Sequence, residues 1–275
     1  MENGICPERY VVIRASLTPQ GLSRPQLLNT YTQERQPVGE DVVTTANAAL
    51  RNYAIIWEAL AGNTSAASLP DPEAGLTAYH QLSQATPEGA ARRKLLKKGL
   101  GQASAIYHSL GREMNQLYSS TAIVNEEPGP FVPIQDPVKH YQKSTYPGRR
   151  LPHVWLRHLI PDKALISTID LAGKGVFTVF TGIVGHAWKT ASITVSKKLR
   201  ITINAYSIGM GQDYEDTYMD WEAVREIEDD GCILVRPDRF VAWRSKTMLP
   251  DVEERLTIVL LNILAGVIEK PEPTT

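Results

Sequence analysis

Residues 175–208 read GVFTVFTGIVGHAWKTASITVSKKLRITINAYSI and decide the fold class. The run 175–181 is short, apolar and rich in β-branched and aromatic residues, which is typical of a buried strand. Apolar residues then recur at helical spacing over 186–198, and 201–208 has the pattern of another strand. A strand, a helix and a second strand in this order imply a crossover connection, so we predict two parallel strands.

The rest of the second half continues this alternation. Its predicted elements are a helix over 217–229, strands over 232–235 and 240–243 joined by a Pro-Asp turn, and a helix over 252–265. Thr217 is the expected N-cap of the first of these helices, and Gly231 its terminator. The order β-α-β-α-β-β-α, with a parallel crossover and an antiparallel hairpin, is that of a thioredoxin-like domain. Residues 182–188 lack the CxxC of a thioredoxin, which excludes thiol–disulfide exchange.

The first half of the chain predicts long helices. Apolar residues recur at spacings of three and four over 38–61, with Pro37 at the start and Gly62 at the end. A similar period runs over 88–119, although several glycines weaken it. Two amphipathic helices cannot bury their apolar faces alone, so these must pack together or on another body.

Prolines mark the boundary between the two halves. The segment 125–152 contains prolines at 128, 130, 133, 137, 147 and 152, which forbid regular helix and favour extended chain. We therefore expect an α/β protein with a helical part over 1–124, a proline-rich linker over 125–152 and a thioredoxin-like domain over 153–275.

Charge and composition exclude several classes of partner. The 275 residues carry 29 basic and 30 acidic side chains, and a formal net charge of -1 gives no field to attract nucleic acid or an anionic membrane. The longest apolar run, 257–268, falls short of the roughly 20 residues that span a bilayer. The first residues do not have the pattern of a secretory signal, so we expect a cytoplasmic protein. Cys6 and Cys232 show no CxxC spacing, which predicts two free thiols, with Cys232 in a buried strand, and no zinc site.

Four strings together resemble one known family. They are LLNTYTQERQPVG at 27–39, LGREMNQLYSS at 110–120, YPGRRLPH at 146–153 and CILVRPDRFVAWR at 232–244. In this order they are similar to segments of the FAD-dependent aromatic hydroxylases of the phenol 2-monooxygenase and dichlorophenol monooxygenase type. The chain resembles the C-terminal portion of that family, with the first 124 residues matching the end of its flavin domain.

The resemblance implies a thioredoxin-like tail and, in full-length relatives, FAD and NAD(P)H as redox partners. The GxGxxG that opens a dinucleotide-binding helix occurs nowhere in this sequence. Residues 1–5 are similar to the family segment that lies against the flavin ring, but Glu2 and Pro7 depart from its pattern. We therefore expect this chain to hold no cofactor and no metal, and its catalytic residues are unknown.

Several polar residues are candidates for function. The pair Glu34-Arg35 is expected to fix local structure through an ion pair at the turn before a helix. If the protein has acid–base activity without redox chemistry, then His153, Tyr146 and Asp170 are the groups to mutate first. Three further sets have structural interpretations: Arg92, Arg93, Lys94, Lys97 and Lys98 as a solvated helix face, Asp213, Glu215, Asp216 and Asp220 as an acidic helix N-terminus, and Trp188, Trp221 and Trp243 as core aromatics.

Three functions follow as alternatives. The first is a short or divergent member of the aromatic monooxygenase family, in phenol degradation or secondary metabolism, that neither binds FAD nor hydroxylates on its own. The second is a cyclase or isomerase that acts on a hydrophobic phenolic or polyketide intermediate in a cleft between the helical part and the thioredoxin-like domain. The third is a subunit that forms a homodimer or docks a separate flavin lobe.

Overall fold

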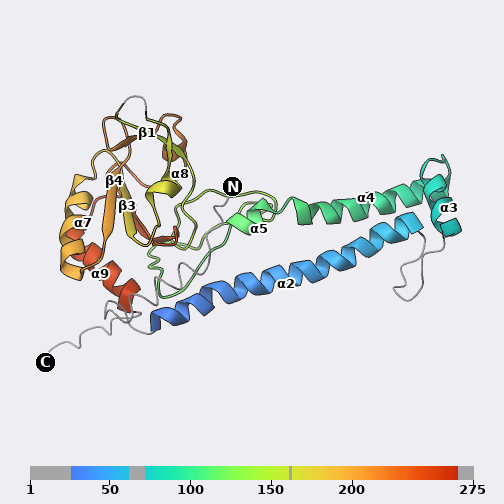
Figure 1. Cartoon of the computed structure of the whole chain (residues 1–275), viewed down its shortest axis with the longest axis horizontal. Helices are drawn as coiled ribbons and strands as arrows, with labels where there is room; N and C mark the ends of the chain where they lie inside the picture. Colours follow the sequence, from blue (N-terminus) through green and yellow to red (C-terminus); the bar gives the residue numbers. More distant parts are fainter. Residues whose placement is uncertain (1–25, 62–71, 161–162, 266–275) are drawn as a thin grey trace. The chain divides into compact units, whose positions relative to one another are not determined.

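The computed structural model describes residues 26–61, 72–160 and 163–265 (Figure 1). Contacts between residues group the chain into two compact units. The sheet unit comprises Met1–Arg35, Met114–Pro133 and Gln142–Thr275, and the helical unit comprises Gln36–Glu113 and Ile134–Tyr141. The domain boundaries expected at residues 124 and 152 stay a prediction. Cys6, Gly62 and the segment 1–5 lie outside the described residues.

A four-stranded sheet forms the centre of the sheet unit, in the order β4-β3-β6-β7. Strand β3 (Phe177–Thr181) runs parallel to β4 (Ile203–Ser207), and helix α7 (His186–Leu199) connects them, as the sequence predicted. Strand β6 (Cys232–Val235) pairs antiparallel with β3 and with β7 (Val241–Ser245). The predicted order and the antiparallel hairpin are confirmed, and the sheet order is that of a thioredoxin-like domain.

Both faces of this sheet are covered. Because side chains alternate along a strand, Val179 of β3 enters one core cluster and Phe180 the other. Helices α7 and α9 (Val252–Ala265) cover the first face, where Trp188 packs edge-on against Trp243 at a ring-centroid distance of 5.8 Å. Trp221 lies in the second cluster. All three tryptophans are buried, which confirms their interpretation as core residues.

A smaller sheet in this unit was not predicted from the sequence. It has the order β2-β1-β5 and consists of β1 (Trp155–His158), β2 (Ile166–Ser167) and β5 (Tyr214–Glu215), with the short helix α6 (Thr168–Leu171) following β2. These strands have two to four residues, so their hydrophobic alternation is too brief to distinguish from loop.

Helix α8 corrects a second prediction. It extends only over Asp220–Val224, and its N-cap is Met219 in the left-handed region (φ 59°), not Thr217. The Asp216 carboxylate accepts hydrogen bonds from the backbone N–H groups of Asp220 and Glu222, at 3.1 and 3.0 Å. A side chain four residues before the helix therefore satisfies its first donors, and a local capping pattern does not reveal this.

Helix α2 extends over Gln26–Ala61 and contains Pro37 in its interior, so the predicted start at Pro37 is wrong. A proline inside a helix removes one hydrogen bond and crowds the preceding turn, and this local cost normally ends a helix. Here Thr30 and Glu34, in the turns before Pro37, are buried within the sheet unit. Tertiary contacts therefore hold the first turns in helical form.

The helical unit consists of the rest of α2 together with α3 (Pro72–Leu82), α4 (Pro87–Tyr107) and α5 (Leu110–Met114). Helix α3 was not predicted, and the single helix predicted over 88–119 ends at Tyr107 before the short α5. The Thr86 side chain caps α4 by accepting the Gly89 N–H at 3.1 Å. Over the described parts of the chain, every helix is too short or too polar to cross a lipid bilayer.

The central sheet generates a test of the core. We expect Leu234→Ala to lower the free energy of unfolding by about 2–5 kcal/mol, because this fully buried side chain of β6 would leave a cavity. Urea unfolding followed by circular dichroism measures the change. The control Val184→Ala, at a side chain that is 62% exposed, should cost less than about 0.5 kcal/mol. Equal unfolding midpoints for the two variants would contradict this assignment of the core.

Candidate functional site

Three buried charged residues of the sheet unit, Glu34, Arg236 and Asp238, form a cluster that we call the ion cluster. The side chains are 1%, 0% and 6% exposed. The Arg236 guanidinium donates to both Glu34 oxygens at 2.6 and 2.9 Å, and to both Asp238 oxygens at 3.0 and 2.6 Å. Two bidentate pairs thus share one guanidinium, the geometry in which Arg binds carboxylates best.

Neighbouring groups complete the ion cluster. Ser120 Oγ donates to Glu34 Oε1 at 2.5 Å, and the ring of Tyr118 stacks on that of Phe240 at a centroid distance of 4.1 Å. Arg35 donates to the Tyr118 hydroxyl at 3.1 Å. Burial raises the pKa of Tyr118, and this outweighs the opposing effect of Arg35. Glu34 and Arg35 therefore lie within a helix and bind distant partners, which corrects the expectation of a local ion pair at a turn.

A second charged network centres on Arg244 in β7. Its Nε donates to Glu127 at 2.6 Å, and its Nη1 donates to Thr145 at 2.9 Å and to Glu226 at 2.5 Å. Two pockets of about 490 and 440 Å³ border this network. Trp243, Leu249 and Ile258 line the first pocket, and Phe131, Gln142 and Tyr146 line the second.

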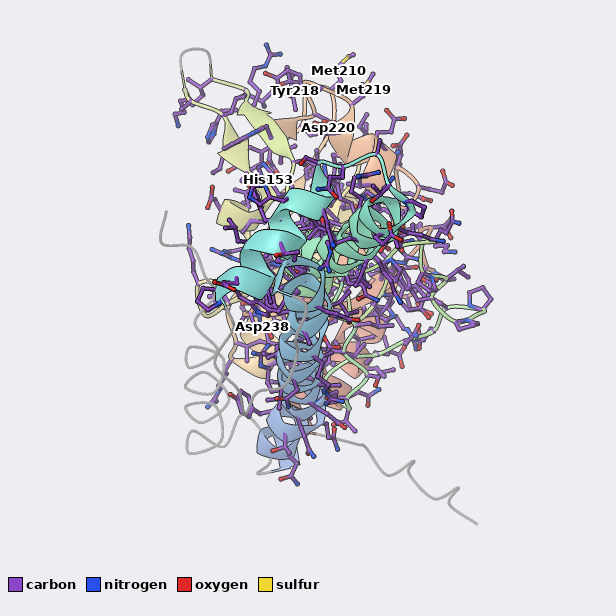
Figure 2. The ribbon with its side chains drawn as sticks, turned by 90° about the vertical axis from the view of Figure 1, so that its right-hand side faces the viewer. His153, Met210, Tyr218, Met219, Asp220 and Asp238 are labelled. Carbon is purple, nitrogen blue, oxygen red and sulfur yellow. The ribbon has the colours of Figure 1, made fainter. Side chains whose placement is uncertain are left out.

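A third pocket, of about 490 Å³, lies where β3 and β4 end. Its apolar lining includes Ile183, Ile208, Met210, Met219 and Trp221. Figure 2 shows Met210 and Met219 at one end of the sheet unit, away from Asp238 of the ion cluster. In open sheets, ligands bind at such strand ends.

The charges and the backbone around this third pocket limit its chemistry. Arg157 pairs with Glu215, and Arg225 pairs with Asp229 at 2.7 Å. The pocket adjoins the loop 182–185 between β3 and α7. A Cβ at Gly182 would lie 2.5 Å from the Asp229 carbonyl oxygen, and one at Gly185 would lie 1.6 Å from Thr181 Oγ1. The pocket can receive an apolar group, but it presents no thiol.

A comparison with known proteins identifies a family that matches this domain. A family model described as aromatic-ring hydroxylase, C-terminal, matches residues 144–265. These residues belong to that family. The matched residues include the central sheet, Asp238, and Arg244 with its partners Thr145 and Glu226.

Similar proteins extend the match to the first half of the chain. The chain is 40% identical over 241 residues to phenol 2-monooxygenase of Pseudomonas sp. (strain EST1001), which covers 88% of this chain and 39% of that protein. It is 38% identical over 251 residues to 2,4-dichlorophenol 6-monooxygenase of Cupriavidus pinatubonensis (strain JMP 134 / LMG 1197), covering 91% of this chain and 41% of that protein. The chain thus spans about two fifths of the length of the curated relatives it matches, and it is related to their C-terminal part.

A solved structure agrees with this relationship. The flavin-dependent monooxygenase PieE, crystallised with FAD and substrate, is 32% identical and superposes with a TM-score of 0.83. The match covers 92% of this chain and 42% of that chain. The resemblance to FAD-dependent aromatic hydroxylases expected from the four sequence strings is confirmed.

The three acid–base candidates do not form one site. His153 Nδ1 and Ser167 Oγ lie 2.6 Å apart, and the His153 ring packs edge-on against Trp155. Asp170 is exposed in the first turn of α6. Tyr146 belongs to the Arg244 network, where its hydroxyl donates to the Gly129 carbonyl and accepts from Asn125. The cyclase or isomerase activity stays a prediction that these contacts do not support.

The acidic set after β4 has mixed roles. Asp213 accepts hydrogen bonds from Lys189 at 2.5 Å and from the Ser207 N–H at 2.8 Å. Burial would raise the pKa of Asp213, but these hydrogen bonds outweigh it and lower the pKa. Only Asp216 and Asp220 lie at the start of α8, as expected. Over the described residues, no group of three His, Cys, Asp or Glu side chains could hold a metal ion.

The basic set of α4 needs a partial correction. Arg92 donates to the Ala59 carbonyl at 2.8 Å, and Arg93 donates to the carbonyls of Leu82 and Gln84. Ala59 and Leu82 lie in the last turns of α2 and α3, and Gln84 lies in the turn before α4. Arg92 is half-buried, whereas Arg93, Lys94, Lys97 and Lys98 are exposed as predicted. Cys232 is buried as expected, and burial raises the pKa of its thiol, which keeps it protonated and unreactive.

The ion cluster predicts a large effect of one substitution. Glu34→Ala should lower the free energy of unfolding by about 3–5 kcal/mol, because it leaves the buried Arg236 with one carboxylate partner fewer. Chemical denaturation measures this loss. Glu58→Ala removes an exposed glutamate of the same helix and is the matched control. Similar unfolding curves for both variants would show that the ion cluster does not hold α2.

The Arg244 network predicts a dependence on pH. Burial would raise the pKa of Glu127, but its contacts with Arg244 and Lys246 outweigh burial and lower the pKa. A lowered pKa in the folded state gives stability above the unfolded value of about 4.3, which is lost as the pH falls through the folded value. We expect the urea midpoint of Glu127→Gln to fall less steeply than that of the wild type between about pH 5 and pH 3. An unchanged slope would assign the acid sensitivity to other carboxylates.

Proposed function

We propose that this chain is the C-terminal part of an FAD-dependent aromatic hydroxylase and that its own role is structural, without flavin binding or hydroxylation. The ion cluster carries this proposal. Three of the four strings that resemble the family contribute to it: Glu34 from 27–39, Tyr118 and Ser120 from 110–120, and Arg236 with Asp238 from 232–244.

Burial determines what these family residues can do. The Glu34 and Asp238 carboxylates bind a guanidinium that is fully buried, so none of these groups can meet a substrate or cofactor in this arrangement. Their common effect is to fix the start of α2 to the hairpin of β6 and β7. In a hydroxylase, these contacts would fix the end of the flavin-binding part against the C-terminal domain.

The residues that the structure describes offer no pyrophosphate site that fits FAD. The cofactor, when bound in relatives, supplies the oxidising chemistry, and its pyrophosphate needs a glycine-rich turn at a helix N-terminus. Gly209 and Gly211 have positive φ, but the chain after them enters strand β5 and not a helix. The Thr86 cap of α4 and the Gly185 start of α7 have no GxGxxG before them.

The proposal predicts a colourless protein. The chain, incubated with excess FAD and then passed through a desalting column, should retain less than about a tenth of an equivalent of flavin, because it lacks a pyrophosphate cradle. Absorbance of the eluted protein near 450 nm, about the usual flavin band, reads the occupancy. The matched positive control is phenol 2-monooxygenase of Pseudomonas sp. (strain EST1001) treated in the same way. Retention of one equivalent of FAD by this chain would refute the proposal.

A further inference from the structure

At the third pocket of the sheet unit, large apolar side chains are exposed beside a cavity. Met210 is 85% exposed, Met219 is 65% exposed, and Tyr218, next to Met219, is 58% exposed. Both methionines line the cavity of about 490 Å³, whose lining also includes the buried Trp221. Figure 2 shows Met210, Tyr218 and Met219 at the same end of the sheet unit. Exposed apolar side chains around a hollow are typical of a surface that binds a partner.

Backbone contacts fix the chain at both methionines, although their side chains are exposed. Gly209, which precedes Met210, donates its N–H to the Tyr214 carbonyl at 2.9 Å and has a φ of 150°. A Cβ at Gly209 would lie 2.5 Å from the Ile183 side chain, so the turn requires glycine. Met219 begins helix α8 as its N-cap, with a φ of 59°. A fixed backbone loses little entropy on binding, while the flexible methionine side chains adapt to the shape of a partner.

The chain around the third pocket is strongly acidic, although the whole protein is nearly neutral. Residues 208–230 contain nine acidic side chains and one basic side chain, Arg225. Arg225 pairs with Asp229, and Arg157 of β1 pairs with Glu215, so both cations of the pocket lining are already neutralised. The lining also includes the exposed Glu222, which pairs with no cation within the part of the chain that the structure describes. The local field therefore attracts cations and repels anions.

These features limit the chemistry of a ligand. The apolar interior of the pocket fits an apolar side chain, and the exposed carboxylates of Asp220 and Glu222 fit a cation beside it. The same charges disfavour a nucleic acid and an anionic lipid surface, because both are negative. A small molecule would use the cavity alone. Tyr218 and Val184, which is 62% exposed, adjoin lining residues in the sequence and extend the apolar surface, so a segment of another protein fits better.

We propose that the third pocket is a docking site for a basic amphipathic segment of a partner protein. The segment packs an apolar side chain against Met210 and Met219 and places lysine or arginine beside Asp220 and Glu222. An apolar groove with acidic edges is a recurring way to bind such segments. Methionines accept more than one apolar side chain, so charge determines the choice of partner more than shape does. This role goes beyond the proposed structural one, and it involves neither the ion cluster nor flavin.

Fluorescence anisotropy with a labelled model peptide tests the proposal. The probe is an amphipathic helical peptide of about 14 leucine and lysine residues, and a matched peptide of leucine and glutamate is its control. The 275-residue chain should bind the lysine peptide with a dissociation constant of about 10 µM or lower. It should bind the glutamate peptide at least about tenfold more weakly. Equal affinity for both peptides, or no binding of the lysine peptide at about 100 µM protein, would overturn the proposal.

Two double variants separate the apolar contact from the charges. Met210→Gln/Met219→Gln should weaken binding of the lysine peptide about tenfold and leave its salt dependence unchanged, because no charge is altered. Asp220→Asn/Glu222→Gln should weaken binding at low salt by about tenfold and also reduce its salt dependence, because salt screens exposed charges. Wild-type affinity in either variant would place the peptide elsewhere and contradict the proposal.

Matched substitutions elsewhere in the sheet unit are the controls. Val132→Gln changes a side chain that is 75% exposed, and Glu253→Gln/Glu254→Gln removes two exposed acids of α9. Both should leave the dissociation constant within about twofold of the wild type, and circular dichroism verifies that every variant folds. Equal losses in the controls and the pocket variants would sink the proposal. So would equal affinity for octylammonium, which would assign the pocket to small amphiphiles. Neither result bears on flavin retention, so it is distinct from failure of the proposed function.

Discussion

A guanidinium buried between two carboxylates is the constraint on which the sheet unit depends. Transfer of these charges from water is costly, and only nearly complete hydrogen bonding offsets it. Arg236 meets this condition with four bonds to Glu34 and Asp238, and Ser120 adds a fifth bond to Glu34. Removal of any one of these residues leaves the buried charges of the others without full compensation for their desolvation. The cluster therefore permits one arrangement of α2 on the hairpin. This also explains why α2 continues through Pro37.

Much of the fold could be predicted because periodicity is a local property. The alternation of β3, the helical spacing of α7 and α9 and the turn between β6 and β7 are each visible within about a dozen residues. The predictions failed where distant contacts override local preference. Pro37 within α2 is one such case, and the capping of α8 by Asp216 is another. The strands β2 and β5 have two residues each and carry no period at all.

The candidate site was less accessible from the sequence. Glu34 lies in one of the strings that resemble the family, but its partner Arg236 is 202 residues away. Spacing along the sequence does not show that two such residues are in contact. One signal was present: Arg236 directly follows the apolar strand CILV, where a charge needs a buried partner. The arginines at 92 and 93 show the reverse error, because a run of like charges conceals which members bind backbone carbonyls.

The loop between β3 and α7 leaves no room for side chains at two of its positions. Gly182 and Gly185 stand at the spacing of the two cysteines in a CxxC, yet the Asp229 backbone and the Thr181 side chain already occupy the space of any Cβ there. Cysteines at these two positions would require the backbone at Asp229 and the side chain of Thr181 to move. This loop therefore accommodates residues without a side chain at both positions, and the close packing of β3 on α7 depends on them.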